Sequence, residues 1–258
     1  MEAHPKNFSK SANRALDVLS YFAATKEPAR AAAIADALGI SRSSADQLLK
    51  TIVSGGYLVL STRDKTYFPS PTLVKFGRWI SGCYPEDARL RSIVAEVQAE
   101  TGAAVHLSMQ NDCYMQIIEV ASDQGDGQCV RVGDKVPVIG SAVGAAALTT
   151  MSEAQVNRLT LRARGQRAVS QPFEGIGAVL TGVRQYRRLG YAACAGTAWG
   201  HANGGDLWDL AVVAPQAERN ARFILGVSGP ADRMREKESY MVSAMRRCLA
   251  RHVSNPAN

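Results

Sequence analysis

The feature that most constrains this chain is a pair of amphipathic helical patterns joined by only about three residues. The first pattern ends at Gly39, and glycine commonly follows the last turn of a helix because it tolerates the left-handed conformation. Ser41 can accept a hydrogen bond from an amide of the next turn, so it is expected to begin the second helix, which runs to Gly55. An earlier pattern, from Ala15 to Phe22, adds a helix before the pair. So short a connection predicts a helix-turn-helix.

The second helix of the pair has two chemically different faces. Its apolar residues recur at i, i+3, i+4 and i+7 from Ala45, and this spacing predicts that they face a core. The opposite side carries the candidate DNA contacts Ser41, Arg42, Ser43, Ser44, Gln47 and Lys50. Small residues let a helix approach a duplex, glutamine can pair with an adenine edge, and lysine can neutralise a phosphate. An ordinary amphipathic helix with a solvated face has the same composition, so this helix alone leaves both interpretations open.

A short hairpin is predicted directly after the helix pair. Two β-prone runs, residues 57–61 and 66–68, flank a turn in which Arg63 and Lys65 can reach the DNA backbone or minor groove. Residues 1–80 hold 11 basic and 6 acidic side chains, against a net charge of +7 for all 258 residues. Charge alone would equally fit a solvated basic surface. Three helices, a short turn and a basic-tipped wing together predict a DNA-binding domain.

The rest of the chain mixes strand and helix patterns, which predicts an α+β domain. It is preceded by an expected linker helix over residues 73–80. The later expected elements are a helix closing at Gly102, strands over 105–109 and 114–120, a helix with a capping box from Ser152 to Gln155, a helix before Gly190, strands over 210–214 and 223–228, and a terminal helix from about Arg233 to His252.

Along almost its whole length the chain resembles an IclR-type bacterial transcriptional regulator. The segments that carry the resemblance are residues 14–19, 33–57, 67–77, 132–137, 141–146, 189–191, 214–215 and 227–230. The resemblance implies two domains. These are an N-terminal winged helix-turn-helix, mostly α, over residues 9–71, and a C-terminal α+β, GAF-like effector-binding domain over residues 85–254, with a linker helix over 72–84 between them.

Three departures from the family pattern affect the expected contacts. Gln47 stands where the family usually has arginine, so base preference does not transfer. Ala145 replaces the usual lysine after Gly144. Ala211 stands where many members have a cysteine, and the usual acidic residue shortly after Tyr191 is missing. The last departure puts the family's ligand-anchoring chemistry in doubt.

The ligand expectation centres on residues 137–148. Ser141 can cap a helix whose first residues are small, so a carboxylate can approach its amides and the positive helix end. The resemblance implies a small organic acid as effector, and Trp199 and Trp208 favour an aromatic one. The expected effector-binding residues are Ser141, Ala142, Val143, Gly144, His106, Met109, Trp199 and His201. The alternative is a helix that simply packs its small residues against the sheet.

Other functional classes find little support in the sequence. Residues 140–144 have the glycine spacing of a nucleophile elbow, but the serine comes one position early. Gly175 and Gly177 lack the third glycine of a dinucleotide motif. The four histidines and five scattered cysteines lack the spacing of a metal site, so no metal is expected. Because the two motifs above also fail, no catalysis and no cofactor are expected. The odd cysteine count suits a reducing compartment, and neither a signal peptide nor a membrane span is expected.

The sequence predicts a cytoplasmic protein that binds double-stranded operator DNA, and the resemblance implies that it responds to a ligand and represses catabolic genes. One chain presents one recognition helix, so a homodimer on a two-fold operator is expected, and the resemblance allows a dimer of dimers. Two alternatives stay open. One is a DNA-binding protein with a structural, ligand-independent C-terminal domain, and the other is an enzyme fused to a DNA-binding module.

Overall fold

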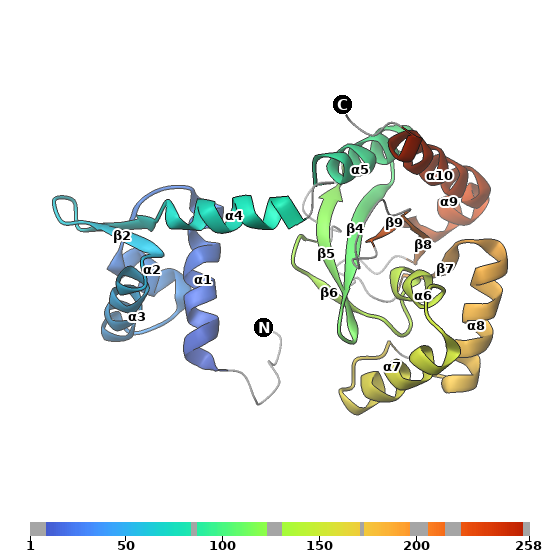
Figure 1. Cartoon of the computed structure of the whole chain (residues 1–258), viewed down its shortest axis with the longest axis horizontal. Coiled ribbons are helices and arrows are strands. Elements are labelled where there is room, and N and C mark those ends of the chain that lie inside the picture. Colours follow the sequence, from blue (N-terminus) through green and yellow to red (C-terminus); the bar gives the residue numbers. More distant parts are fainter. Residues whose placement is uncertain are drawn as a thin grey trace. The chain divides into compact units, whose positions relative to one another are not determined.

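The computed structural model describes residues 9–83, 87–122, 131–170, 173–196, 206–214 and 223–254. The chain folds into two compact units, residues 1–85 and 86–258. Figure 1 shows both units and labels most of their helices and strands.

The first unit is a three-helix bundle with a small sheet. Helices α1 (Lys10–Thr25), α2 (Ala31–Leu38) and α3 (Arg42–Ser54) are followed by the hairpin β2 (Leu58–Ser61) and β3 (Thr66–Pro69) and by α4 (Thr72–Cys83). A two-residue strand, β1 (Ala29–Arg30), pairs with β3 and gives the order β1-β3-β2. The core residues include Val18, Phe22, Ile34, Leu49, Leu58 and Tyr67.

The helix ends of this unit follow from local chemistry. Ser9 Oγ accepts a hydrogen bond from the Ala12 amide at 3.3 Å and so caps α1. Gly39 ends α2 with a φ of 61°, in the left-handed region that favours glycine. Ser41 caps α3 two residues later. The predicted helix-turn-helix and its connection are confirmed.

The second unit is a six-stranded antiparallel sheet with helices on both faces (Figure 1). In sheet order, its strands are β6 (Lys135–Pro137), β5 (Tyr114–Ala121), β4 (Ala104–Asn111), β9 (Phe223–Pro230), β8 (Leu207–Val213) and β7 (Ala192–Ala195). Helices α5 (Asp87–Thr101), α9 (Ala231–Glu236) and α10 (Glu238–Ser254) pack on one face. The other face carries α6 (Ala142–Leu148), α7 (Glu153–Gly165) and α8 (Ile176–Leu189). The predicted α+β class is confirmed.

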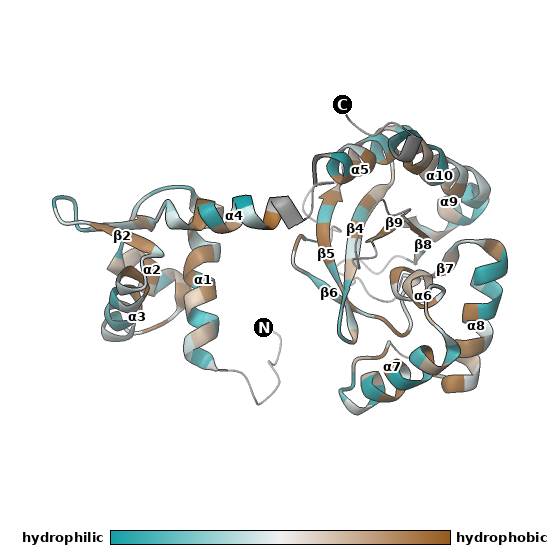
Figure 2. Cartoon of the chain, viewed as in Figure 1, coloured by the Kyte–Doolittle hydropathy of each residue, from teal (hydrophilic) through white to brown (hydrophobic). Residues whose placement is uncertain are grey.

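Side-chain alternation divides each strand between two hydrophobic cores. In β4, Val105 and Leu107 belong to the core under α5 and α10. The intervening residues, His106 and Ser108, are buried and point to the opposite face, where α6 lies. Figure 2 shows apolar colour along the central strands and polar colour on the outer sides of α7 and α8.

The expected terminal helix is wrong in one respect, since the structure has two helices that meet at Lys237. The start of α10 is fixed by contacts that no local pattern reveals. Tyr191 Oη donates to one oxygen of Glu238 at 2.6 Å, and Trp208 Nε1 donates to the other at 3.2 Å. The sequence also missed β1, β6 and β7, which have two to four residues each and little periodic signal.

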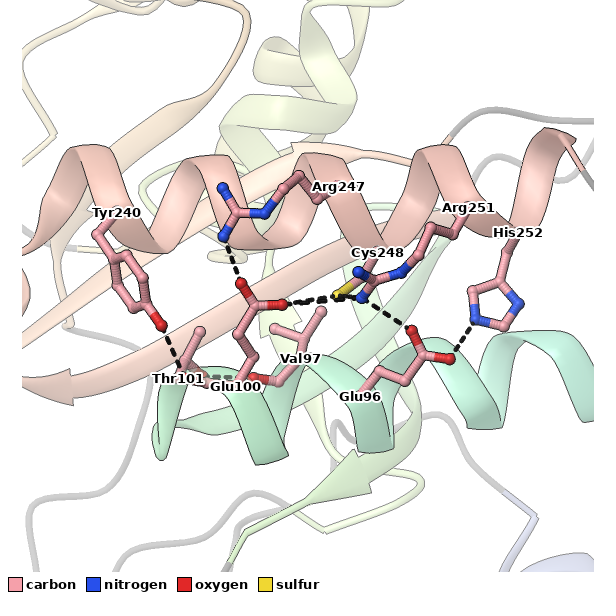
Figure 3. Close-up of polar contacts among 9 residues, drawn as sticks. All are labelled: Glu96, Val97, Glu100, Thr101, Tyr240, Arg247, Cys248, Arg251 and His252. Atoms are coloured by element: carbon pink, nitrogen blue, oxygen red, sulfur yellow. Dashed lines mark hydrogen bonds and ion pairs between the residues drawn. The ribbon is translucent and has the colours of Figure 1, made fainter.

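A polar ladder joins α10 to α5 (Figure 3). Glu96 accepts hydrogen bonds from Arg251 at 3.1 Å and from His252 at 2.8 Å. Glu100 pairs with Arg247. The Arg247 hydrogen bond lowers the pKa of Glu100. Partial burial alone would raise the pKa of Glu96, but its hydrogen bonds to His252 and Arg251 outweigh this and lower it. Both carboxylates therefore stabilise the folded state at neutral pH, and this contribution is lost as pH falls through their lowered folded pKa values.

Candidate DNA interface and ligand-binding region

The outer face of α3 presents polar side chains to solvent. Arg42, Ser43, Gln47 and Lys50 are all exposed, while the opposite face of the helix is buried. Lys50 lies 3.8 Å from Asp46, one helical turn earlier, and both side chains are mostly solvated. Such exposed pairs are weak, so Lys50 remains available to a phosphate.

The serines at the start of α3 are partly engaged with one another. Ser41 Oγ accepts from the Ser44 amide at 3.2 Å, donates to Ser44 Oγ at 2.8 Å, and lies 3.1 Å from Ser43 Oγ. Ser41 and Ser44 therefore shape the helix start. The side chains best placed for an outside partner are those of Arg42, Gln47 and Lys50.

The wing tip is built as a tight turn. Ser61 Oγ donates to Asp64 Oδ2 at 2.9 Å, and Lys65 follows with a φ of 54°. This turn leaves Arg63 and Lys65 exposed on either side of Asp64. The structure thus places two candidate cations at the end of the hairpin, in the same unit as the α3 face.

One side of α4 is apolar and exposed. Phe76, Trp79 and Ile80, at spacing i, i+3 and i+4, are 45%, 68% and 45% exposed. Figure 2 shows apolar and polar colour alternating along this helix. Phe76 contacts the ring of Tyr57 at a centroid distance of 5.9 Å. We call Phe76, Trp79 and Ile80 the α4 stripe.

The helix at the centre of the ligand expectation, α6, is capped as predicted. Ser141 Oγ accepts from the Gly144 amide at 3.1 Å and donates to the Pro137 carbonyl at 2.6 Å. Ala142 and Val143 are 1% and 3% exposed and lie in the core. A Cβ atom on Gly144 would stand 2.0 Å from the Val138 carbonyl oxygen, so the loop packs directly against this glycine. These small residues therefore pack closely against the loop and the core.

His106 occupies the same side of the sheet as α6. It pairs with Gly226 across β4 and β9, and a Cβ on Gly226 would stand 2.2 Å from His106 Nε2. The glycine therefore makes room for the imidazole. Burial lowers the pKa of His106 to about 4, so the ring is neutral at physiological pH.

We expect the buried imidazole to make the second unit sensitive to mild acid. Because the folded pKa of His106 is lowered, the unfolded chain takes up a proton first, and stability falls as pH drops from about 6.5 to about 4. The slope for one proton is at most about 1.4 kcal/mol per pH unit. Denaturant unfolding across this range should give a flatter profile for His106→Gln than for the wild type. A profile unchanged by His106→Gln would contradict the prediction.

Met109, another expected ligand residue, is not brought together with Ser141. Met109 packs with the core under α5 and α10, on the face of the sheet opposite His106. It lies three residues after His106 in β4, and successive side chains of a strand point to opposite faces. It is therefore not part of a pocket at α6. Trp199 and His201 lie outside the described residues. Trp208 packs with the same core as Met109, and the Arg235 guanidinium lies 4.2 Å from its ring centroid.

Sequence reasoning missed three polar residues on the face of the sheet that α6 covers. Asp209 and Ser228 are buried cross-strand neighbours, and Cys194 pairs with Asp209 from β7. Burial, with a smaller contribution from Asp209, raises the pKa of the Cys194 thiol to about 12, although the Ala142 amide donates to it. An acidic residue inside the apolar run Leu207–Val213 was the one signal that could have pointed here.

The described residues contain no cluster of three or more histidine, cysteine, aspartate or glutamate side chains able to hold a metal ion. Within the same part of the chain, every helix is too short or too polar to cross a membrane.

Comparison with known proteins agrees with both units. The helix-turn-helix model of IclR matches residues 11–60, and the model of the bacterial transcriptional regulator IclR C-terminal domain matches residues 87–255. The chain is thus a DNA-binding transcriptional regulator with a winged N-terminal unit and an α+β C-terminal unit. It belongs to the IclR family.

Individual relatives are distant. XynR, an HTH-type transcriptional regulator of Escherichia coli K12, is 24% identical over 189 residues, which cover 71% of this chain and 73% of XynR. An IclR transcriptional regulator from Alicyclobacillus acidocaldarius has a TM-score of 0.63 at 20% identity, covering 96% of this chain and 98% of its own. The Agrobacterium tumefaciens repressor BlcR has a TM-score of 0.54 at 16% identity, covering 96% and 97%.

Proposed function

We propose that this regulator is a cytoplasmic repressor of catabolic genes that binds a two-fold operator and releases it when a small organic acid binds the C-terminal domain. The observation that carries the DNA-binding part is the exposed set Arg42, Gln47 and Lys50 on α3, with Arg63 and Lys65 at the wing tip. These residues combine phosphate neutralisation with one side chain able to read a base edge. BlcR, a repressor of the same fold, supports the direction of regulation.

The proposed acid site is the amide end of α6. The Gly144 amide is taken by Ser141, and the Ala142 amide is directed at the neutral thiol of Cys194. A carboxylate that displaces this thiol contact would gain a charged acceptor at the positive helix end. His106 lies on the same side of the sheet, and its buried imidazole is neutral.

Ligand response would work as a population shift. An acid that binds one arrangement of the DNA-binding units better than another increases the population of the first arrangement. The resulting change in operator affinity cannot exceed the ratio of the acid's affinities for the two arrangements. No catalytic step is part of this proposal.

The α4 stripe supports a homodimer, because three exposed apolar side chains on one helix face are typical of a surface covered by a second copy. A second copy also supplies the second recognition helix that a two-fold operator needs.

Trp79→Asp should therefore raise the dimer dissociation constant at least tenfold, because it would bury a charge between the two stripes. Sedimentation velocity over a range of concentrations measures this. Val74→Asp is the matched control, since Val74 is 54% exposed on α4 but lies away from the stripe. Equal effects of the two variants, or none, would count against dimerisation through α4.

The test of the whole proposal is a footprint on the DNA upstream of the protein's own gene, repeated with acetate, succinate and benzoate. Protection that one acid removes supports a ligand-responsive repressor. Protection that none of them changes, with no shift in unfolding temperature, supports the ligand-independent alternative.

A further inference from the structure

A cavity of about 210 Å³ lies between α6, α8 and β7 in the second unit. One wall is the α6 side formed by Ser141, Ala145 and Leu148, at spacing i, i+4 and i+7. The other wall is α8, from Ala178 to Tyr186, and Phe173 closes one side. The cavity extends along the side of α6, and it shares Ser141 and Cys194 with the acid site proposed above at the amide end of that helix.

The walls are mostly apolar. Val138, Ile139, Leu148 and Val183 belong to the buried core, and Phe173 and Val179 pack against it. A well-packed core leaves few voids larger than a water molecule. A dry apolar cavity of about 150 Å³ is enough to hold benzene in another protein. This space is therefore large enough for a six-membered ring with a small substituent.

Apart from Glu174, the polar side chains on the walls are uncharged, and Ser141 and Tyr186 are engaged within the protein. Ser141 Oγ both donates and accepts within the protein. Tyr186 Oη donates to the Ala193 carbonyl at 2.9 Å, and burial raises the pKa of its phenol. Cys194 is a neutral thiol, as described above.

The lining residues themselves offer no cation. Among those described, Glu174 is the sole acidic side chain and none is lysine, arginine or histidine, while Arg164 lies over the Phe173 ring, 5.3 Å from its centroid. A carboxylate ligand would therefore lose its hydration without gaining a cation, and it would meet a like charge. The rings of Phe173 and Tyr186 offer favourable edge or stacking contacts to another aromatic ring.

We propose that the α6–α8 cavity is a binding site for an uncharged, single-ring aromatic molecule, such as a benzyl alcohol or a phenol. This ligand differs in charge from the acid proposed for the amide end of α6. Because Ala145 and Val179 line the cavity but are not part of that acid site, changes at these two residues test the cavity separately.

The experiment titrates the full chain with benzyl alcohol and with benzoate, which have the same ring and differ in charge, using calorimetry and the unfolding temperature. Ala145→Leu fills the cavity from the α6 wall, and Val179→Phe fills it from the α8 wall. Ala154→Leu, an identical change at an exposed site on α7, is the control. Unfolding curves in the absence of probe establish that each variant folds.

Benzyl alcohol should bind the wild type and Ala154→Leu equally, and at least tenfold more weakly to either filled variant. Benzoate, which is expected at the amide end of α6, should bind the filled variants as tightly as it binds the wild type. The proposal is overturned if benzyl alcohol does not bind, if neither filling variant weakens it, or if benzoate binding is lost together with it. If one filling variant does not fold, the affinity of benzyl alcohol for the other filling variant, from the opposite wall, is the test.

Discussion

Replacing Gly144 with alanine is expected to destabilise the C-terminal unit by about 3 kcal/mol or more, the upper end of the cost of overpacking a core. The new Cβ would stand 2.0 Å from the Val138 carbonyl oxygen and 2.6 Å from the Val138 Cα. Both are backbone atoms, so no side chain can rotate away and the loop or the helix must move. Chemical denaturation of the full chain, followed by circular dichroism, measures the loss.

The control for this prediction is Gly177→Ala in the first turn of α8. A Cβ at Gly177 meets nothing within 4 Å, so alanine there should be neutral or slightly stabilising through its higher helix propensity. If both glycine variants unfold at the same denaturant concentration, the close approach of α6 to the loop at Val138 is wrong.

The packing of α6 also decides how an acid site can be tested. A substitution such as Ala142→Leu places a bulky side chain where a carboxylate would bind. Ala142 is 1% exposed and lies in the core, so leucine there would overpack the protein regardless of any ligand. Lost ligand response in that variant would carry no information about the amide end of α6.

The elements predicted well from sequence are those whose signals are local. Ser41 and Gly39 specify the ends of α3 and α2 through their own side chain and backbone, and Ser152 with Gln155 forms the predicted capping box. The candidate DNA face of α3 follows from the same periodicity, because residues opposite a buried stripe must face solvent. Helical periodicity predicts that these side chains are exposed but does not test their contact with DNA, so that contact remains a prediction.

The features that sequence could not supply depend on pairing between distant strands. Asp209 and Cys194 face each other only because β7 lies next to β8, and β7 has four residues with no strand periodicity. The sequence predicts the strand that carries His106 and Met109. It did not reveal that the two side chains point to opposite faces of the sheet. The α6–α8 cavity likewise needs three segments far apart in the chain.

Operator binding should lose strength uniformly when the cations of the first unit are removed. Lys50→Ala and Arg63→Ala are each expected to weaken binding to all sequences, and together at least tenfold near physiological salt. Each lost phosphate contact should also reduce the slope of log affinity against log salt by about one. Asp46→Asn should act in the opposite direction, because it removes the carboxylate that lies 3.8 Å from Lys50 Nζ. Titrations by fluorescence anisotropy at several salt concentrations provide both the affinity and the slope.

Gln47→Ala should behave differently from the lysine and arginine variants. It removes a base-reading side chain without changing charge, so specific binding should weaken by about 1–3 kcal/mol while binding to unrelated DNA and the salt slope stay unchanged. Lys135→Ala, which removes an exposed cation from the second unit, is the charge control and should alter neither quantity. If Lys135→Ala reduces the slope as much as Lys50→Ala does, the phosphate contacts are not confined to the winged helix. If Gln47→Ala weakens specific and non-specific binding equally, Gln47 contacts the backbone of the duplex and base recognition belongs to other residues of α3.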